Sequence, residues 1–303
     1  MTTRVNGSEL FYLGIDGGGS KCKARLVSSD NVVLGVGVSG PANPFHGMQQ
    51  TLTSITEAAA LAIRDAGLDN GVLRNTVAGM GLAGVNLPSL YQAMLEWRHP
   101  FHRMFLATDL HIACLGAHNG NYGAVMIAGT GSCGYIHVEK KTAMYGGHGF
   151  PVGDKGSGAW LGLEAIKAVL LAVDDLGPAT SLTQVIRDTL GAEGLDIVEK
   201  LAGAPSSLYG RLAPGVLQAA NNGDAVARAI VEDGAGYLSA LGEKLLAFDP
   251  PRLSMLGGLG PVILPWMKPT VAELITEPLD QPEAGAILFA QQEWQREQRA
   301  VGS

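Results

Sequence analysis

The clearest pattern near the start of the chain is an alternation of apolar and basic residues over residues 21–27. Cys22, Ala24 and Leu26 fall on one face of an extended segment, and basic residues fall on the other. An apolar run ending in three glycines precedes this segment, and "VVLGVGV" follows it after the turn "SSDN". The pattern predicts three antiparallel strands, with a glycine loop joining the first to the second.

Other segments show helical spacing. Apolar residues recur every three or four positions from Met48 to near Gly67, which predicts an amphipathic helix. Residues 159–249, approximately, carry several segments of the same kind, and "EAGAILFAQQEWQREQ" predicts a closing helix. "TVAGMGLAG", "MFLATD" and "PRLSMLGGLG" predict short strands; the second ends on Asp109, and "LHIACLGAHNG" after it predicts a helix.

The opening plan recurs once, over residues 122–147. An apolar run, a loop of small and hydroxyl residues and an alternating strand follow one another in the same order. The repetition predicts two related domains. We expect the first to span residues 1–112, completed by a C-terminal helix at 286–303. We expect the second to span residues 113–285, with the helical block as an insertion.

Composition fits this organisation and excludes several classes of partner. The 303 residues are 47% hydrophobic, enough for two cores, and a net charge of −7 without a basic run argues against nucleic-acid or anionic-membrane binding. No signal sequence precedes the first strand, and no apolar stretch approaches the roughly 20 residues of a membrane span. Cys22, Cys114 and Cys133 form neither an even set nor a CxxC pair. We therefore expect a cytoplasmic protein with reduced thiols.

The first glycine loop has two interpretations. Phosphate loops of the dinucleotide-binding and Walker types run from a strand directly into a helix, and the Walker pattern GxxxxGK[ST] is absent here. The loop is therefore either a simple tight turn or a nest of backbone amides that binds an anion between two strands.

Six motifs taken in order favour the second interpretation. The segments are "GIDGGGSK", "ATDLHIACLGA", "IAGTGSCG", "GDKGSGAWLG", "MLGGLG" and "EAGAILFA". Their order resembles the actin, heat-shock ATPase and hexokinase superfamily. Within it, the chain is similar over essentially its whole length to the N-acetylglucosamine kinase group, which includes bacterial glucosamine kinases and is related to benzoyl-CoA reductase activator ATPases.

The resemblance implies an α/β fold and a reaction. It implies two actin/hexokinase-like (ribonuclease H-like) domains, each a mixed sheet flanked by helices, with the active site in the interdomain cleft. It also implies transfer of the γ-phosphoryl of ATP, with Mg²⁺, to the 6-hydroxyl of glucosamine, a small-molecule amino sugar of chitin-derived catabolism. A homodimer is expected from the family alone.

The resemblance assigns nucleotide contacts to three turns, although local capping or simple turns would explain the same residues. These contacts are Gly17, Gly18, Gly19, Ser20, Lys21, Gly129, Thr130, Gly131, Ser132, Gly257, Gly258 and Gly260.

Two aspartates match acidic residues of the family. Asp16 matches the residue that holds magnesium, and a carboxylate with phosphate oxygens suits a hard cation. Asp109 matches the catalytic base that takes the proton of the attacking hydroxyl. The alternatives are a turn role for Asp16 and an N-cap role for Asp109.

The resemblance also assigns a set of sugar contacts. They are Asn43, Asp109, Thr130, Gly147, His148, Gly149 and Asp154. An Asn-Pro turn is the alternative for Asn43, and an ion pair with Lys155 is the alternative for Asp154.

Two departures from the family bear on the sugar. His148 stands where animal N-acetylglucosamine kinases have a tryptophan, and Lys155 stands where they have a glutamate. We favour glucosamine as the substrate, with N-acetylglucosamine as the alternative.

Proteins of other classes share this nucleotide core. An ATP-driven activator would hold an iron–sulfur cluster through cysteines, but Cys22 and Cys133 flank the phosphate loops and leave only Cys114. A sugar-sensing regulator would carry a DNA-binding domain ahead of the first loop. The position of Cys22 and Cys133 also suggests that oxidation blocks nucleotide binding.

Overall fold

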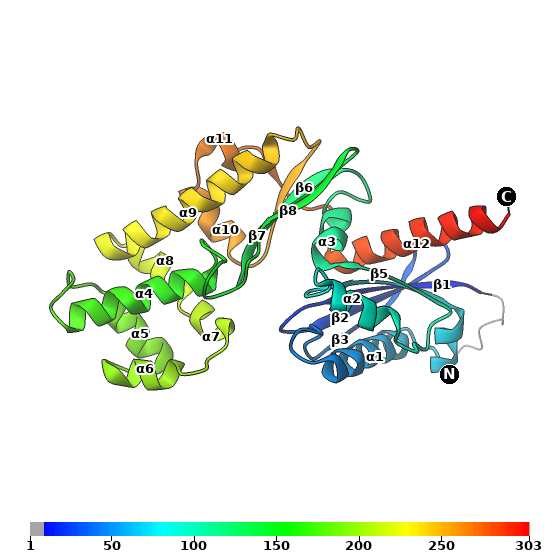
Figure 1. Ribbon diagram of the computed structural model, residues 1–303, viewed down its shortest axis with the longest axis horizontal. Coiled ribbons are helices and arrows are strands. Elements are labelled where there is room, and N and C mark those ends of the chain that lie inside the picture. The colour runs from blue at the N-terminus through cyan, green and yellow to red at the C-terminus, as the bar shows by residue number, and fades with distance from the viewer. Residues whose placement is uncertain (1–8, 303) are drawn as a thin grey trace. The chain divides into compact units, whose positions relative to one another are not determined.

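The computed structural model describes residues 9–302, which divide into two compact units (Figure 1). Unit 1 comprises the chain up to Tyr122 and returns from Pro278, and unit 2 comprises Gly123–Glu277. Each unit has one five-stranded mixed sheet with helices packed on it. This confirms the predicted fold class.

The sheet of unit 1 has the strand order β3-β2-β1-β4-β5. β1, β2 and β3 form the predicted antiparallel meander, whereas β4 and β5 run parallel to β1. β4 is buried throughout, as expected for a strand covered on both faces. The bounds are Phe11–Gly17 for β1, Cys22–Ser28 for β2, Val33–Ser39 for β3, Thr76–Leu82 for β4 and Arg103–Thr108 for β5.

Helices lie close to this sheet because glycines face them. Gly35 and Gly37 of β3 adjoin the carbonyls of α1, and an added Cβ at Gly37 would lie 2.1 Å from the Ala58 oxygen. Gly14 of β1 and Gly79 of β4 face α12 in the same way. The bounds are Met48–Asp65 for α1, Asn70–Asn75 for the 3₁₀ helix η1, Pro88–Leu95 for α2, Asp109–Ala117 for α3 and Pro282–Val301 for α12.

The sheet of unit 2 repeats this topology, with the order β10-β9-β6-β7-β8. β6, β7 and β8 form an antiparallel meander, and β9 and β10 add in parallel. The repeat predicted from residues 122–147 is thus present as a repeat of topology. The bounds are Gly123–Ala128 for β6, Ser132–Val138 for β7, Lys141–Gly146 for β8, Leu253–Leu256 for β9 and Ile275–Thr276 for β10.

A helical block connects β8 to β9 in unit 2. Its apolar faces form the largest part of the core of this unit, as the helical spacing predicted. The bounds are Gly158–Val173 for α4, Leu182–Leu190 for α5, Leu195–Leu201 for α6, Ser206–Gly210 for α7, Ala213–Asn221 for α8 and Ala225–Leu246 for α9. Short elements follow β9, namely α10 (Gly260–Ile263), η2 (Leu264–Trp266) and α11 (Pro269–Ala272).

The units divide later in the chain than the sequence predicted. A boundary after residue 112 would cut α3, but α3 packs along α12 and stays with unit 1. The contact is close because Gly285 of α12 faces α3, where an added Cβ would lie 1.9 Å from the Ile112 oxygen. The chain likewise returns to unit 1 at Pro278 rather than at residue 286.

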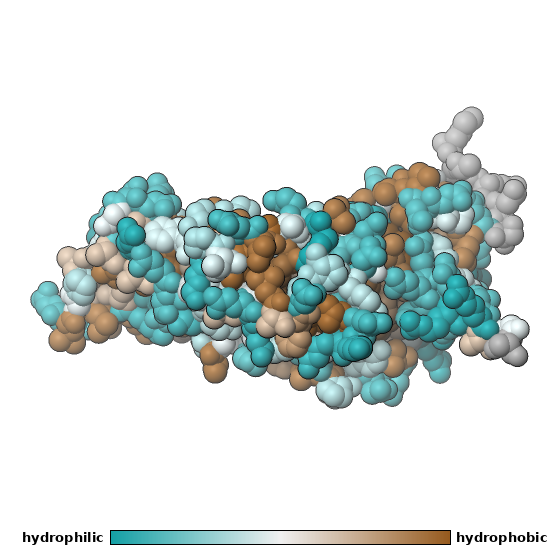
Figure 2. Space-filling view, turned by 90° about the horizontal axis from the view of Figure 1, so that it is seen from above, coloured by the Kyte–Doolittle hydropathy of each residue, from teal (hydrophilic) through white to brown (hydrophobic). Residues whose placement is uncertain are grey.

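The surface mixes hydrophilic and hydrophobic residues on the face drawn in Figure 2. Within residues 9–302, no helix combines the length and the apolar character needed to cross a bilayer.

Candidate active site

Asp16 and Asp109 lie at one edge of the unit 1 sheet. Asp16 is in register with Gly81 of β4, and Gly81 is in register with Ala107 of β5, two residues before Asp109. The carboxyl ends of parallel strands meet at the same edge. Gly81 lets α3 approach, since an added Cβ would lie 2.2 Å from the Cγ1 of Ile112. The two carboxyl groups are therefore neighbours.

Asp109 is the first residue of α3 rather than its cap. Thr108 is the N-cap, and its Oγ1 accepts a hydrogen bond of 3.2 Å from the His111 amide. The capping role that the sequence allowed for Asp109 thus belongs to Thr108. The Oδ1 of Asp109 accepts from the Leu110 amide at 2.9 Å. Burial raises the pKa of Asp109, against the hydrogen bonds from the Leu110 and Asp109 amides.

Asp16 experiences an excess of negative charge. Burial raises its pKa to about 7, and the neighbouring Asp109 and Glu283 carboxylates add to the effect. Lys21 and Lys23 oppose it. A buried carboxylate with this surplus is a site where a bound cation would be stabilised.

The first glycine loop is a tight turn with exposed backbone. Gly18 donates to the Lys21 oxygen at 3.0 Å, and the Gly18 oxygen accepts from Ala42 at 2.9 Å. Gly19, Ser20 and Lys21 are exposed. Both interpretations of this loop fit the structure, because a closed turn can present its remaining amides to an anion.

Asn43 lies beside this loop in an Asx turn. Its Oδ1 accepts from the Phe45 amide at 3.0 Å, so the turn that was the alternative for this residue is present. The same oxygen is close to Gly84, where an added Cβ would lie 2.4 Å away and φ is +85°. Sequence reasoning missed Gly84, although it falls in the glycine-rich bend after β4.

The second glycine loop is anchored to the start of α4. The Gly129 oxygen accepts from the Gly158 amide at 2.8 Å, and the Thr130 oxygen accepts from Ala159 at 3.3 Å. The Ser132 hydroxyl donates to the Lys155 oxygen at 2.7 Å. The loop therefore lies at a helix N-terminus, where backbone dipoles favour an anion.

The turn after β9 lies against the second loop. Gly257 has φ +103°, and an added Cβ would lie 2.4 Å from the Ala128 oxygen, which accepts from Leu259 at 3.0 Å. Gly258 is exposed with open space around it. Gly260 is buried at the start of α10 against Met255, so it faces the protein interior.

Asp154 contacts the same loop and is not paired with Lys155. An added Cβ at Gly131 would lie 2.8 Å from the Asp154 Oδ2, and the Oδ1 accepts from the Gly149 amide at 3.3 Å. Lys155 instead lies 2.7 Å from Asp233, so the alternative for Asp154 is wrong. Asp154 has φ 59°, a strained conformation of the kind found at functional sites. The pKa of Asp154 is raised, because the effect of burial exceeds the opposing effects of the Gly149 and Ser132 amides and of His148.

The remaining predicted sugar contacts lie on the segment after β8. Gly147 donates to the Ser132 oxygen at 3.1 Å, and His148 and Gly149 are exposed. Tyr237 of α9 also reaches this segment, since an added Cβ at Gly146 would lie 2.9 Å from its hydroxyl. No sequence pattern pointed to Tyr237.

The predicted residues thus form two groups, one in each unit. Unit 1 gathers Asp16, Gly17, Gly18, Gly19, Ser20, Lys21, Asn43 and Asp109. Unit 2 gathers Gly129, Thr130, Gly131, Ser132, Gly147, His148, Gly149, Asp154, Gly257 and Gly258, with Gly260 turned inward. A cavity of about 300 Å³ near α4, α5 and α6 contains none of these residues.

The donor set of unit 1 fits a magnesium ion that is shared with phosphate. Among residues 9–302, no group of three or more His, Cys, Asp or Glu side chains could hold a metal. Asp16 would supply one carboxylate, and phosphate oxygens and water would complete the shell, as magnesium usually requires.

The three cysteines are buried and form no disulfide. Burial raises the pKa of Cys22 to about 12, with Asp16 acting in the same direction and a Ser39 hydrogen bond opposing it. Burial therefore disfavours the thiolate of Cys22, which is the form that is oxidised; the predicted effect of oxidation on nucleotide binding stays a prediction.

Relatives of known sequence match most of the chain. A model described as the BadF/BadG/BcrA/BcrD ATPase family matches residues 13–290. The chain is 35% identical over 284 residues to the glucosamine kinase GspK of Vibrio cholerae, covering 92% of this chain and 95% of that protein. It is 29% identical over 249 residues to the N-acetyl-D-glucosamine kinase of Dictyostelium discoideum, covering 76% and 77%.

Solved structures share the fold. A protein of Chromobacterium violaceum, to which an N-acetylglucosamine kinase function is ascribed, matches with a TM-score of 0.85 at 29% identity, covering 94% of this chain and 100% of that chain. A ROK family glucokinase from Streptomyces griseus, solved with glucose and AMPPNP, matches with a TM-score of 0.54 at 18% identity, covering 93% and 99%. The similarity to the Streptomyces glucokinase supports the fold alone.

Proposed function

The chain belongs to the BadF/BadG/BcrA/BcrD ATPase family, and we propose that it is an amino-sugar kinase, which transfers the γ-phosphoryl of ATP to the 6-hydroxyl of glucosamine. The observation that carries the proposal is the 35% identity to a glucosamine kinase over 92% of this chain. The two groups of residues at the sheet edges support it, because each contains glycine turns suited to phosphate and polar side chains suited to a sugar.

Asp109 is the proposed catalytic base. Its carboxyl group lies at the carboxyl end of β5, and Thr108 rather than Asp109 caps α3. Burial raises its pKa above the ordinary value, which makes the carboxylate a stronger proton acceptor at neutral pH. Asp109 would take the proton of the sugar 6-hydroxyl as that oxygen attacks phosphorus.

The glycine turns are the proposed nucleotide contacts. The amides of Gly19 and Ser20 and the turn at Gly257 offer donors and close backbone approach without side-chain obstruction, and the start of α4, whose first amides bond to the second loop, adds the positive end of its helix dipole. Asp16 would hold magnesium, which when bound offsets the charge of the phosphate oxygens. The surplus of negative charge around Asp16 supports this assignment.

Asn43, Asp154, His148 and the glycines beside it are the proposed sugar contacts. Asp154 is fixed by the Gly149 amide and held beside the second loop. The Oδ1 of Asn43 is used by its own turn, which leaves its amide nitrogen as the donor for a sugar hydroxyl.

N-acetylglucosamine is the second candidate substrate. It is favoured by the N-acetylglucosamine kinase names of the Dictyostelium relative and of the Chromobacterium structure. Glucosamine is favoured by the higher identity to the Vibrio enzyme and by His148 in place of the family tryptophan. We further propose that the protein is cytoplasmic and forms a homodimer. Light scattering of the purified protein would test the dimer.

The test of the proposed function is sugar-dependent release of ADP from MgATP. Glucosamine, N-acetylglucosamine and glucose are compared at equal concentrations, and Asp109→Asn, purified identically, reveals contaminating kinases. A rate confined to glucosamine supports the proposal. A rate confined to N-acetylglucosamine keeps the kinase and changes the substrate. No sugar-dependent rate would favour an ATPase activator or a sugar-sensing regulator.

A further inference from the structure

Lys23 lies directly opposite Asp16 in the antiparallel pair of β1 and β2. Residues opposite one another in such a pair project to the same face, with Cβ atoms about 5 Å apart. A lysine side chain is long enough to bring its ammonium to that carboxylate. An ion pair of this kind would occupy the oxygen atoms that a metal ion needs.

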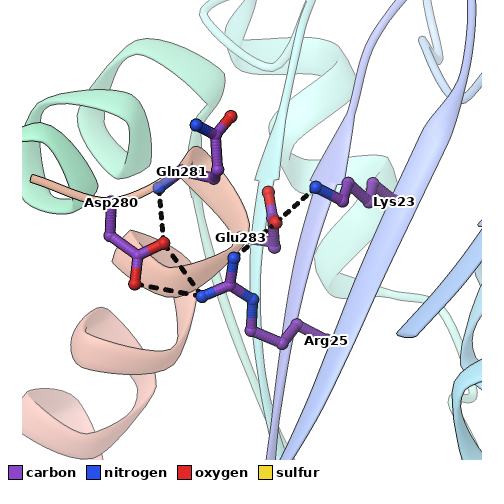
Figure 3. A network of polar contacts seen from close by, with 5 residues as sticks. All are labelled: Lys23, Arg25, Asp280, Gln281 and Glu283. Carbon is purple, nitrogen blue, oxygen red and sulfur yellow. Dashed lines mark hydrogen bonds and ion pairs between the residues drawn. The ribbon is translucent and has the colours of Figure 1, made fainter. Parts of the chain in front are cut away.

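The ammonium of Lys23 is held elsewhere. Its Nζ lies 2.6 Å from the Oε1 of Glu283, in the first turn of α12, and the Nη2 of Arg25 donates to the same oxygen at 2.9 Å (Figure 3). Among the ion pairs of residues 9–302, none joins Lys23 to Asp16. The Glu283 side chain is only 1% exposed, so water screens its attraction for both cations weakly.

Glu283 is itself fixed in place. Its backbone oxygen would lie 1.9 Å from a Cβ at Gly14, so α12 lies directly on β1. The Nη1 of Arg25 donates to both carboxylate oxygens of Asp280 at 2.9 and 3.0 Å, and one of these oxygens accepts from the Gln281 amide at 2.7 Å. Arg25 would therefore stay anchored to α12 if the charge of Glu283 were removed.

The charges that act on Asp16 come from α3, α12, the first loop and β2. Asp109 and Glu283 act on it as negative charges, from α3 and α12, and Lys21 and Lys23 act as positive charges, from the loop and β2. Glu283 and Lys23 are thus both close enough to influence Asp16.

We propose that Glu283 is a positioning residue, which holds the ammonium of Lys23 away from Asp16 and so leaves the Asp16 carboxylate open to magnesium. The proposal rests on the proposed function, because it takes Asp16 as the residue that binds the metal. The first turn of α12 then sets the metal affinity of a site to which it contributes no ligand.

Removing the charge of Glu283 tests this directly. In Glu283→Gln, Lys23 is held less strongly and turns to Asp16, where it competes with magnesium. We expect the dissociation constant of Mg–ADP, measured by isothermal titration calorimetry, to rise about tenfold, which corresponds to about 1.4 kcal/mol. The same titration without magnesium separates loss of metal binding from loss of nucleotide binding, and we expect Glu283→Gln to leave it little changed.

A second substitution distinguishes positioning from mere structural support. In Glu283→Gln/Lys23→Met the competing ammonium is gone, and we expect Mg–ADP affinity to return to within about threefold of the wild type, a coupling typical of residues in contact. Damage to the packing of α12 would not be repaired by removing another polar side chain. Glu297→Gln is the matched control, because it removes an equal charge from the same helix at an ion pair with Arg103.

The outcomes separate the two proposals. Unchanged affinity in Glu283→Gln, or a double variant as weak as the single one, overturns the role of Glu283 and leaves the kinase intact. A wild-type protein that binds no Mg–ADP overturns the proposed function and this inference with it. If Glu283→Gln does not fold, Lys23→Met alone decides. The Lys23→Met protein should bind Mg–ADP at least as tightly as the wild type. A loss of about tenfold in its affinity would mean that Lys23 itself contacts the nucleotide, and this would overturn the proposal.

Discussion

The two sheets have the same topology but carry different chemistry in their first hairpins. In the β1–β2 hairpin, the second residue pair from the loop consists of Asp16 and Lys23. In the β6–β7 hairpin, the second pair from the loop consists of Ile127 and Cys133. The charged groups of the candidate site are therefore concentrated in unit 1. A repeated fold does not imply a repeated role for each half.

The loops that follow these strands also differ in what supports them. The first loop is tied to irregular backbone, through Ala42 and Ala83. The second is tied to the start of α4, through Gly158 and Ala159. The α4 N-terminus supplies partial positive charge to the second loop, whereas the first loop lies beside the Asp16 and Asp109 carboxylates. We therefore expect unit 1 to depend on a cation and unit 2 to depend on backbone donors.

The largest expected effect is on turnover, from Asp109→Asn in unit 1. The amide cannot accept the hydroxyl proton, so we expect kcat to fall by about 10²-fold or more, the scale of a lost general base. Mg–ADP affinity should stay near that of the wild type, because asparagine keeps the size of the aspartate side chain. Steady-state kinetics and calorimetry measure the two quantities. Undiminished turnover would remove Asp109 from the mechanism.

Asp16→Asn and Ser132→Ala compare the two hairpins directly. Asp16→Asn removes a charged metal ligand, and we expect the magnesium concentration for half-maximal activity to rise about tenfold or more. Ser132→Ala removes a hydroxyl that donates to the Lys155 oxygen, and we expect a loss of roughly two- to tenfold in ATP affinity with unchanged magnesium dependence. Equal magnesium dependence in both variants would contradict the assignment of the metal to unit 1.

Local patterns explain which features the sequence could predict. The strand meander, the helix at Met48 and the glycine loops each depend on neighbouring residues, and they were predicted close to their observed places. The sequence left the cap of the helix at Asp109 open, because Thr108 and Asp109 are both good capping residues and only the structure shows which one is used.

Long-range contacts explain what the sequence could not predict. Arg25 and Glu283 are 258 residues apart in the chain, and no periodicity relates them. The boundary between the units was placed too early for the same reason, since α3 is held by α12 from the far end of the chain. The roles of Gly84 and Tyr237 likewise depend on what faces them in space.

The pH dependence of stability should differ in sign between Asp16 of unit 1 and Asp224 of unit 2. In the metal-free protein the pKa of Asp16 is about 7, above its ordinary value, so the folded state binds this proton more tightly than the unfolded state. Stability should therefore fall as pH rises from about 4 to about 7, by at most about 1.4 kcal/mol per pH unit. Urea unfolding across this range measures it, and Asp16→Asn should make the slope shallower, with the raised pKa of Asp109 and Asp154 accounting for the remainder. Parallel curves for the two proteins would show that the pKa of the Asp16 carboxyl is not perturbed.

The smallest expected effect concerns Asp224 in unit 2, a charge with the opposite behaviour. Asp224 caps α9 through the Val226 and Ala227 amides and accepts from Thr180 and Ser181. Burial alone would raise its pKa, but the hydrogen bonds from Ala227, Ser181 and Thr180 outweigh burial and lower it to about 2. Asp224→Ala should cost about 1–2 kcal/mol of unfolding free energy at neutral pH.

The dependence of stability on pH below about 4 distinguishes Asp224 from Asp16. Because the folded pKa of Asp224 lies below its unfolded value, its contribution is complete above about pH 4 and is lost as pH falls toward 2. The difference between the wild type and Asp224→Ala should therefore shrink in urea unfolding at pH 3. Asp224→Asn keeps an acceptor oxygen and should lose less than Asp224→Ala at pH 7. A constant difference between the wild type and Asp224→Ala at both pH values would mean that Asp224 stabilises α9 through packing rather than through its ionised carboxylate.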